Sequence, residues 1–270
     1  MLLYGPRLLL IDYNPFLFLA HPRPPSRALA AGKPAPVSSE FMEDVAKILL
    51  WWLLFGATHI GGSSLPVRGF LIRRLGLMGF KVLYSVVALA TFIPLCSVYF
   101  GNKHAGPLLF LPDSGLKLAT QILMLLALIV LGQSLATKSP MTTLAEMTGR
   151  FGGRARGIQR VTRHPQNFAF ALFGLAHMLS NPFVGDWIFF GGFLIYGLLS
   201  ALHQDKRTLI SGRKEVLEFQ AETSIMPFAA ILAGKQRLAL KEYNKIELLI
   251  SILFFVVLRL LHNRLFGGYL

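Results

Sequence analysis

The chain has 270 residues, of which 54% are hydrophobic and only 15% are charged, and its mean hydropathy is +0.55. Soluble domains carry about 25% charged residues, so this composition excludes an ordinary soluble protein and indicates a polytopic membrane protein. The net charge of +14 does not indicate nucleic-acid binding, because the basic residues lie between apolar runs, as cytoplasmic loops and lipid-facing charges do. We therefore expect membrane lipid as a partner and no nucleic acid.

Residues 1–41 differ in composition from the rest of the chain. Pro6, Asp12 and Pro15 interrupt their apolar part, and the stretch 21–36 is rich in proline and alanine. A signal peptide or a spanning helix needs an unbroken apolar region, which this segment lacks. We expect a disordered tail or a mis-assigned start at 1–41, followed by a single transmembrane domain at 42–270.

Six apolar runs predict the membrane helices of an all-α protein. The fourth and fifth runs are short for spans and read as a helical hairpin that turns at Asn181, Pro182 and Gly185. The six runs cover residues 45–60, 80–100, 116–136, 168–182, 186–203 and 246–262. The sequence thus predicts about six transmembrane helices.

The charges predict the orientation of these helices. If the runs alternate in direction, the segments 61–79, 137–167 and 204–245 share one side, and they hold 17 of the 27 lysines and arginines. By the positive-inside rule these basic loops are cytoplasmic and both termini lie outside. We expect an integral protein of a bacterial inner membrane. The single cysteine, Cys96, lies in an apolar run and allows no intrachain disulfide.

Histidines inside apolar runs are functional candidates, because an ionisable side chain is costly within a membrane. His177 has no charged residue near it in sequence, and His59 lies near the cytoplasmic end of the first run. By helical rise the two lie within about 5 Å in depth, so they suit the two axial positions of a planar macrocycle held between helices. His164, about 20 Å from His177 along one helix, precedes Pro165 at a predicted helix start. His104, His203 and His262 are expected to be interfacial.

Four blocks of the chain together resemble the NnrU family of integral membrane proteins, and the likeness runs from about residue 45 to 270. The blocks are THIGGSSLPVR at 58–68, RVTRHPQN at 160–167, LAH at 175–177 and ETSIMPFAAI at 222–231, the last followed by Gly234-Lys235. The family includes a plant-type 15-cis-zeta-carotene isomerase that binds haem b, and bacterial members linked by name to denitrification.

The resemblance implies a haem b held between His59 and His177 as metal ligands, with His104 as an alternative ligand. It also implies an Arg163-His164 turn that contacts a haem propionate or another anion. The leading activity is cis–trans isomerisation of a carotenoid of the 15-cis-zeta-carotene type, with an apolar small molecule as substrate and no assigned catalytic residue. The first block is two residues longer before its arginine than in the isomerase, so haem binding carries over more readily than carotenoid chemistry.

Two alternative functions stay open at the level of sequence. One is a non-enzymatic haem sensor, electron carrier or assembly factor in nitrogen-oxide metabolism, which needs the same histidine pair. The other is suggested by Arg163-His164-Pro165 and Pro227-Phe228, which also resemble membrane isoprenylcysteine methyltransferases that use S-adenosylmethionine. Against the second, Asn167 stands where that pattern favours tyrosine, and a lone Asp205 stands where paired glutamates are expected.

Overall fold

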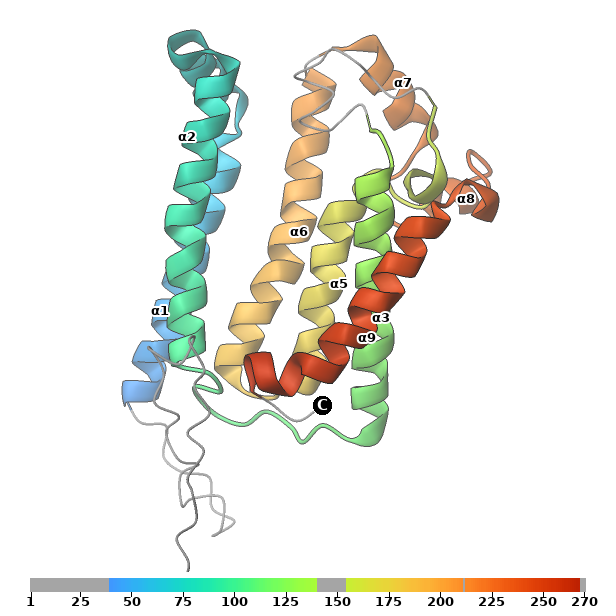
Figure 1. Cartoon of the computed structure of the whole chain (residues 1–270). Coiled ribbons are helices and arrows are strands. Elements are labelled where there is room, and N and C mark those ends of the chain that lie inside the picture. The colour runs from blue at the N-terminus through green and yellow to red at the C-terminus, as the bar shows by residue number, and fades with distance from the viewer. Residues whose placement is uncertain (1–38, 140–153, 211, 268–270) are drawn as a thin grey trace, which may run out of the picture. The chain divides into compact units, whose positions relative to one another are not determined.

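The computed structural model describes residues 39–139, 154–210 and 212–267, and its regular elements there are all helices (Figure 1). The long helices are α1 (Ser39–Gly62), α2 (Leu65–Gly101), α3 (Ser114–Ala136), α5 (Pro165–Ser180), α6 (Val184–Ile210) and α9 (Lys245–Phe266). Shorter elements join them: η3 (Gly157–Arg160), α7 (Lys214–Glu222), α8 (Ala229–Leu232) and η4 (Leu240–Glu242). The predicted all-α class is confirmed.

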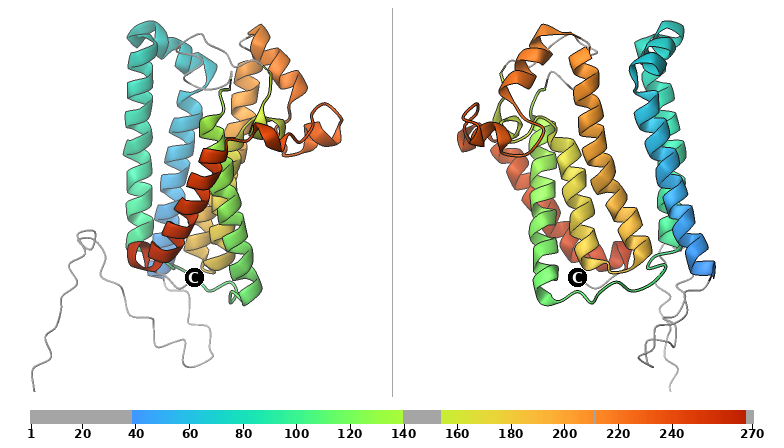
Figure 2. Two further views of the ribbon diagram at one scale, coloured as in Figure 1. Left: turned by 45° about the vertical axis from the view of Figure 1, so that its right-hand side comes forward. Right: turned by 180° about the vertical axis from the view of Figure 1, so that it is seen from behind.

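Five of the six predicted runs lie within one long helix each, and the fourth, 168–182, extends two residues past the end of α5. Of the six long helices in the described ranges, five, all except α5, are long and apolar enough to cross a membrane. α5 has 16 residues, a rise of about 24 Å, which is less than the ~30 Å of a hydrocarbon core. It packs between α3 and α6, as the right-hand view of Figure 2 shows. The chain is therefore that of an integral membrane protein with five candidate spans.

Two predicted boundaries are wrong. The segment 61–79, expected as a loop, is mostly the start of α2, which is interrupted at Gly76, where φ is +70°. The fifth helix, expected to be short, has 27 residues, because α6 continues past the apolar run. Its polar end stays helical because Asp205 and Thr208 are buried against the segment that comes after it.

Two other predictions lie partly outside the described residues. The expected tail falls there up to residue 38, whereas α1 begins at Ser39, three residues before the expected domain start. In the basic loop 137–167, residues 140–153 are also outside the described ranges. The predicted helix start at Pro165 is confirmed, since proline occupies the first turn of α5.

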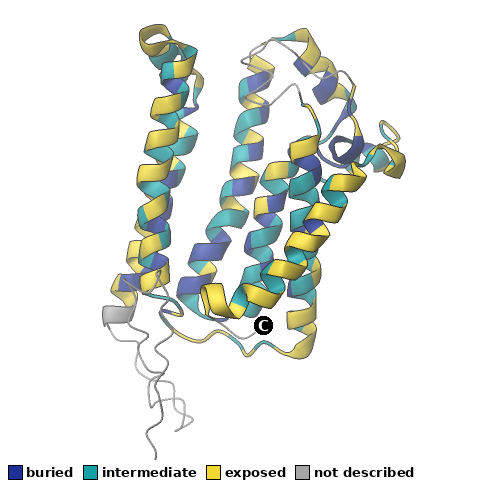
Figure 3. Cartoon of the chain, in the orientation of Figure 1, coloured by how far each residue is buried: buried dark blue, intermediate teal, exposed yellow. Residues whose placement is uncertain are grey.

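Aromatic and aliphatic side chains join α1, α2 and α6 in one buried cluster. Trp52 lies at its centre, where its indole N–H donates a hydrogen bond of 3.0 Å to the carbonyl of Phe189. Tyr99 stacks on Phe189 with ring centroids 3.8 Å apart. Outside this cluster the long helices carry many exposed leucine, valine and phenylalanine residues. Figure 3 colours the ribbon yellow wherever a residue is exposed. Such apolar faces suit a lipid environment.

Glycines let α5 and α6 approach each other closely. A Cβ at Gly174 would overlap the carbonyl oxygen of Phe190 and lie 2.9 Å from the nitrogen of Leu194, and a Cβ at Gly197 would lie 2.6 Å from the Asn167 oxygen. Small residues at such positions are typical of helix contacts in membranes. The α5–α6 hairpin is therefore fixed by backbone contact.

We expect Gly174→Ala to destabilise the protein by about 1–3 kcal/mol, because the added methyl group meets backbone atoms that cannot move without shifting a helix. Thermal unfolding of detergent-purified protein measures the change. The matched control is Gly56→Ala on α1, where an added Cβ meets nothing within 4 Å. Equal unfolding temperatures for the two variants would contradict the close contact.

Candidate functional site

His177 lies in the last turn of α5, inside an aromatic cage. Its ring centroid is 4.3 Å from that of Phe173 and 4.6 Å from that of Phe190 on α6. Its Nδ1 lies 2.9 Å from the carbonyl oxygen of Phe173. A carbonyl oxygen only accepts, so Nδ1 carries the proton and Nε2 carries the free lone pair. Metal-bound histidines are commonly oriented by such a bond from the other ring nitrogen.

His262, near the end of α9, has its ring beside that of His177. The centroids of the two rings are 6.5 Å apart, with 33° between the ring planes. The Nδ1 atom of His262 is buried and has no hydrogen-bond partner. An unsatisfied buried nitrogen is costly, so this ring is a candidate ligand that sequence analysis had assigned to the interface.

His59, in the last turn of α1, lies against other rings of the same aromatic cluster. Its ring stacks on Phe55 with centroids 5.2 Å apart, and it lies 4.3 Å from the ring of Tyr84 on α2 and 5.8 Å from that of Tyr196 on α6. Its Nδ1 is also buried without a partner. His59 thus has the free nitrogen expected of a ligand, but its neighbours differ from those of His177.

The structure does not bring the predicted pair into contact. On α6, His59 lies against Tyr196 and His177 against Phe190, six residues earlier, which is about 9 Å along the helix. Phe193 lies between these levels and packs on Phe173 with centroids 5.1 Å apart. The reason is the direction of the helices: both histidines are in last turns, but α1 runs parallel to α6 and α5 runs antiparallel to it, so the two last turns lie at different levels of α6.

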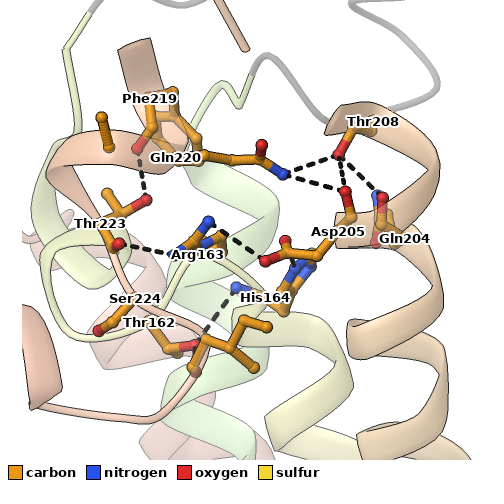
Figure 4. Close-up of polar contacts among 12 residues, drawn as sticks. Thr162, Arg163, His164, Gln204, Asp205, Thr208, Phe219, Gln220, Thr223 and Ser224 are labelled. Carbon is orange, nitrogen blue, oxygen red and sulfur yellow. Dashed lines mark hydrogen bonds and ion pairs between the residues drawn. The ribbon is translucent and has the colours of Figure 1, made fainter. Parts of the chain in front are cut away.

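The basic turn before α5 is engaged within the protein (Figure 4). His164 is buried, and its Nε2 lies 2.6 Å from Oδ1 of Asp205 on α6. The Arg163 guanidinium lies 3.2 Å from Oδ2 of the same carboxylate and donates a 2.7 Å hydrogen bond to the carbonyl of Thr223. One carboxylate therefore accepts both side chains that the resemblance assigned to a propionate or another anion.

We call Arg163, His164 and Asp205 the Asp205 clamp. Hydrogen bonds to and from the segment after α6 surround it. The Thr162 hydroxyl donates to the carbonyl of Ile225, and the amide of Gln220 donates to Thr208 at 2.9 Å. Burial lowers the pKa of Arg163, and the nearby Asp205 charge opposes that shift. The clamp ties the start of α5 to α6 and to the chain after α7.

A second ion pair anchors the same end of the protein. Arg160 of η3 donates two hydrogen bonds of 2.8 and 2.7 Å to the carboxylate of Glu242 in η4, and the Gly157 N–H donates a third at 2.8 Å. The hydrogen bonds from Arg160, followed by that from Gly157, lower the pKa of Glu242 to about 2. The basic loops are thus partly paired with acidic residues that sequence analysis had not matched to them.

Another buried carboxylate, Asp186 in the first turn of α6, accepts hydrogen bonds at the opposite end. The Tyr99 hydroxyl donates to its Oδ1 at 3.0 Å, and Nδ1 of His104 lies 2.8 Å from its Oδ2. His104 is therefore a partner of Asp186. Sequence analysis missed both α6 carboxylates as partners of histidines, although an acidic residue at each end of an apolar run was the signal that could have found them.

The donor set of the histidines bears on the kind of metal they could hold. Within the described ranges no three His, Cys, Asp or Glu side chains gather closely enough for a bare metal ion. Two neutral imidazoles in an aromatic cage suit a metal that brings its own equatorial ligands, as the iron of a haem does. The residues present therefore fit a haem better than a protein-only metal centre.

Comparison with known proteins gives a consistent assignment. The model of a family described as NnrU protein matches residues 47–269. The chain is 27% identical over 223 residues to 15-cis-zeta-carotene isomerase, chloroplastic, of Zea mays, covering 77% of this chain and 58% of that protein. It is 26% identical over 207 residues to the protein of the same name from Arabidopsis thaliana, covering 75% of this chain and 54% of that one. The chain spans little more than half the length of these curated relatives, and no solved structure matches it significantly.

We expect Asp205→Ala to destabilise the protein by about 3 kcal/mol, because it leaves the Arg163 charge and the His164 ring buried without their acceptor. Thermal unfolding in detergent measures the loss. Glu218→Ala is the control, since it removes only an exposed pair with Lys214 and should leave the unfolding temperature unchanged. If Asp205→Ala unfolds at the temperature of the control, the clamp does not hold α5 to α6.

Proposed function

Since the chain belongs to the NnrU family, we propose that it is a membrane-embedded haem b protein that isomerises a cis double bond of a carotenoid-like polyene. The two relatives that match 77% and 75% of this chain, at 27% and 26% identity, are named for the isomerisation of 15-cis-zeta-carotene. The observation that carries the proposal is the hydrogen bonding of His177. Its Nδ1 is bonded to a backbone carbonyl, which leaves Nε2 free to bind a metal.

The residues around His177 define what this chain would contribute to the reaction. The hydrogen bond to Phe173 holds the imidazole in one tautomer and one orientation, so that Nε2 faces away from its own helix backbone. The rings of Phe173, Phe190 and Phe193 surround it with apolar surface, which excludes water and accepts a hydrocarbon chain. A haem b held by His177 would supply an iron centre able to draw electron density from a conjugated double bond, which would lower the barrier to rotation about that bond.

Methyl transfer is a weaker candidate than isomerisation. The Arg-His-Pro turn that resembles methyltransferases has Arg163 and His164 bound to Asp205 within the protein. A cofactor such as S-adenosylmethionine would have to displace a buried carboxylate to reach them, which is costly. The non-enzymatic sensor or assembly factor uses the same haem site, and conversion of a polyene substrate separates it from the isomerase.

The absorbance spectrum of detergent-purified protein, oxidised and then reduced, tests the haem proposal. We expect a low-spin, six-coordinate haem spectrum that His177→Ala abolishes or converts to high spin, because one axial ligand is lost. His203→Ala on α6 is the control, since its ring also has a buried nitrogen without a partner but no ring contact with His177. A colourless protein that stays colourless after haem is added would overturn the proposal.

The isomerase activity is tested on the same preparation. We expect conversion of 15-cis-zeta-carotene to its 15-trans isomer in the dark, at a rate at least tenfold lower in His177→Ala than in His203→Ala, because the altered histidine orients the cofactor. Separation of the isomers by chromatography measures the rates. A protein that binds haem but leaves the polyene unchanged would support a sensor or assembly factor.

The proposal includes the orientation in a bacterial inner membrane, with the basic loops in the cytoplasm. In a Cys96→Ala background, we expect Leu111→Cys in the loop after α2 to react with an impermeant maleimide added to intact cells. Lys241→Cys in η4 should react only after the cells are permeabilised. Both positions are exposed, so access decides the result. The reverse pattern of labelling would invert the proposed topology.

A further inference from the structure

The segment between α7 and α9 exposes large apolar side chains. It includes α8 and η4, and in Figure 1 α8 projects sideways from the long helices, close to the upper end of α9. Leu232, at the end of α8, is 87% exposed. At least half of the surface of each of five apolar residues is exposed here, and we call them the outer apolar surface: Met226, Phe228, Leu232, Leu238 and Leu240.

Hydrogen bonds hold the inner side of the same segment to the chain before α5. The backbone N–H of Phe228 donates to the carbonyl of Val161 at 2.8 Å, and the guanidinium of Arg160 donates to Oε1 of Gln236 at 2.6 Å. Ala230 of α8 is buried. The outer apolar surface therefore cannot turn inward without breaking these bonds, so its exposure is a fixed feature of the fold.

Cations without a carboxylate partner lie between these apolar residues. Arg237, Lys241 and Lys245 are exposed, and among the residues that the structure describes none makes an ion pair with them. Glu242 is the acidic residue of the segment 224–244, and Arg160 already binds it. Exposed leucines beside free cations match the two parts of an anionic phospholipid, its acyl chains and its phosphate.

The position of the segment in the chain agrees with this match. It leads directly into α9, which begins at Lys245 and is one of the five candidate membrane spans. Tyr243 stands two residues before that helix, and tyrosine is enriched where a span meets the headgroups. The outer apolar surface is therefore expected at the boundary between the hydrocarbon and the phosphates.

We propose that the segment 226–245 is a binding surface for an anionic phospholipid of the surrounding leaflet. The acyl chains would lie on the outer apolar surface, and the phosphate would lie between Arg237 and Lys241. A zwitterionic lipid offers the same acyl chains without a net charge, so the cations are the source of selectivity. This surface contains no residue of the proposed haem site, so its test does not depend on haem or on isomerisation.

Fluorescence quenching in lipid nanodiscs tests the proposal. A fluorophore is attached to Leu232→Cys in a Cys96→Ala background, and the nanodiscs contain phosphatidylcholine with a minor fraction of one lipid brominated in its acyl chains. We expect brominated phosphatidylglycerol to quench the label more than brominated phosphatidylcholine does. Arg237→Gln/Lys241→Gln should weaken the binding of phosphatidylglycerol about 30-fold, from about 1 kcal/mol for each cation, and so remove this preference.

The matched control is Lys47→Gln/Lys214→Gln. It removes the same charge from lysines that already pair with glutamates, and it should keep the preference. Arg237→Lys/Lys241→Arg retains both charges and should keep it as well. Wild-type protein gives a test without any substitution, because salt at about 1 M screens charges beyond ~3 Å and should reduce the preference.

Each result decides the proposal. Loss of the preference in Arg237→Gln/Lys241→Gln alone, together with its reduction by salt, supports it. A label that neither brominated lipid quenches would show that the surface faces water or an acidic protein, and would overturn it. Equal quenching by the two lipids, a preference that survives either the glutamine substitutions or salt, or its loss in the control or in the charge-retaining variant would also overturn it. Displacement of the lipid by inorganic phosphate would assign the cations to a soluble anion instead.

Discussion

Two buried carboxylates on α6 are the constraint on which the rest of this structure depends. Asp186 lies in the first turn and Asp205 nineteen residues later, about 28 Å along the helix. An ionised carboxylate is stable at low dielectric only when charged or polar donors surround it. The loop after α2 must therefore close on one end of α6 and the turn before α5 on the other. These two closures set the position of α6 against its neighbours.

The space between these two ends is filled by rings. Trp52, Tyr99 and the phenylalanines of α6 pack together, and glycines at the α5–α6 contact bring the helix backbones close. His59 and His177 lie against these rings, and in the described residues no carboxylate is bonded to either, in contrast to His104 and His164. A neutral imidazole in apolar surroundings is suited to bind iron, and that distinction separates the proposed cofactor ligands from the structural histidines.

The most evident sequence motif and the histidine of the proposed cofactor site lie in different parts of the protein. Arg163-His164-Pro165 begins α5 and holds it to Asp205, whereas His177 lies near the far end of the same helix, about 20 Å away. The turn acts by fixing the hairpin that positions His177 against Phe190. A substitution in the turn is therefore expected to act on the site only through the fold.

Hydropathy, charge placement and helix start signals determined much of this protein from its sequence. The six apolar runs, the helix start at Pro165 and the all-α class depend on composition over one helix length, which burial in lipid requires whatever the neighbours are. The partners of the side chains needed the tertiary structure. Pairing of His164 with Asp205, and of the His177 ring with that of His262, depends on the direction, rotation and register of separate helices. Equal depth along idealised helices placed His59 beside His177, but packing through Tyr196 and Phe193 keeps the two rings apart.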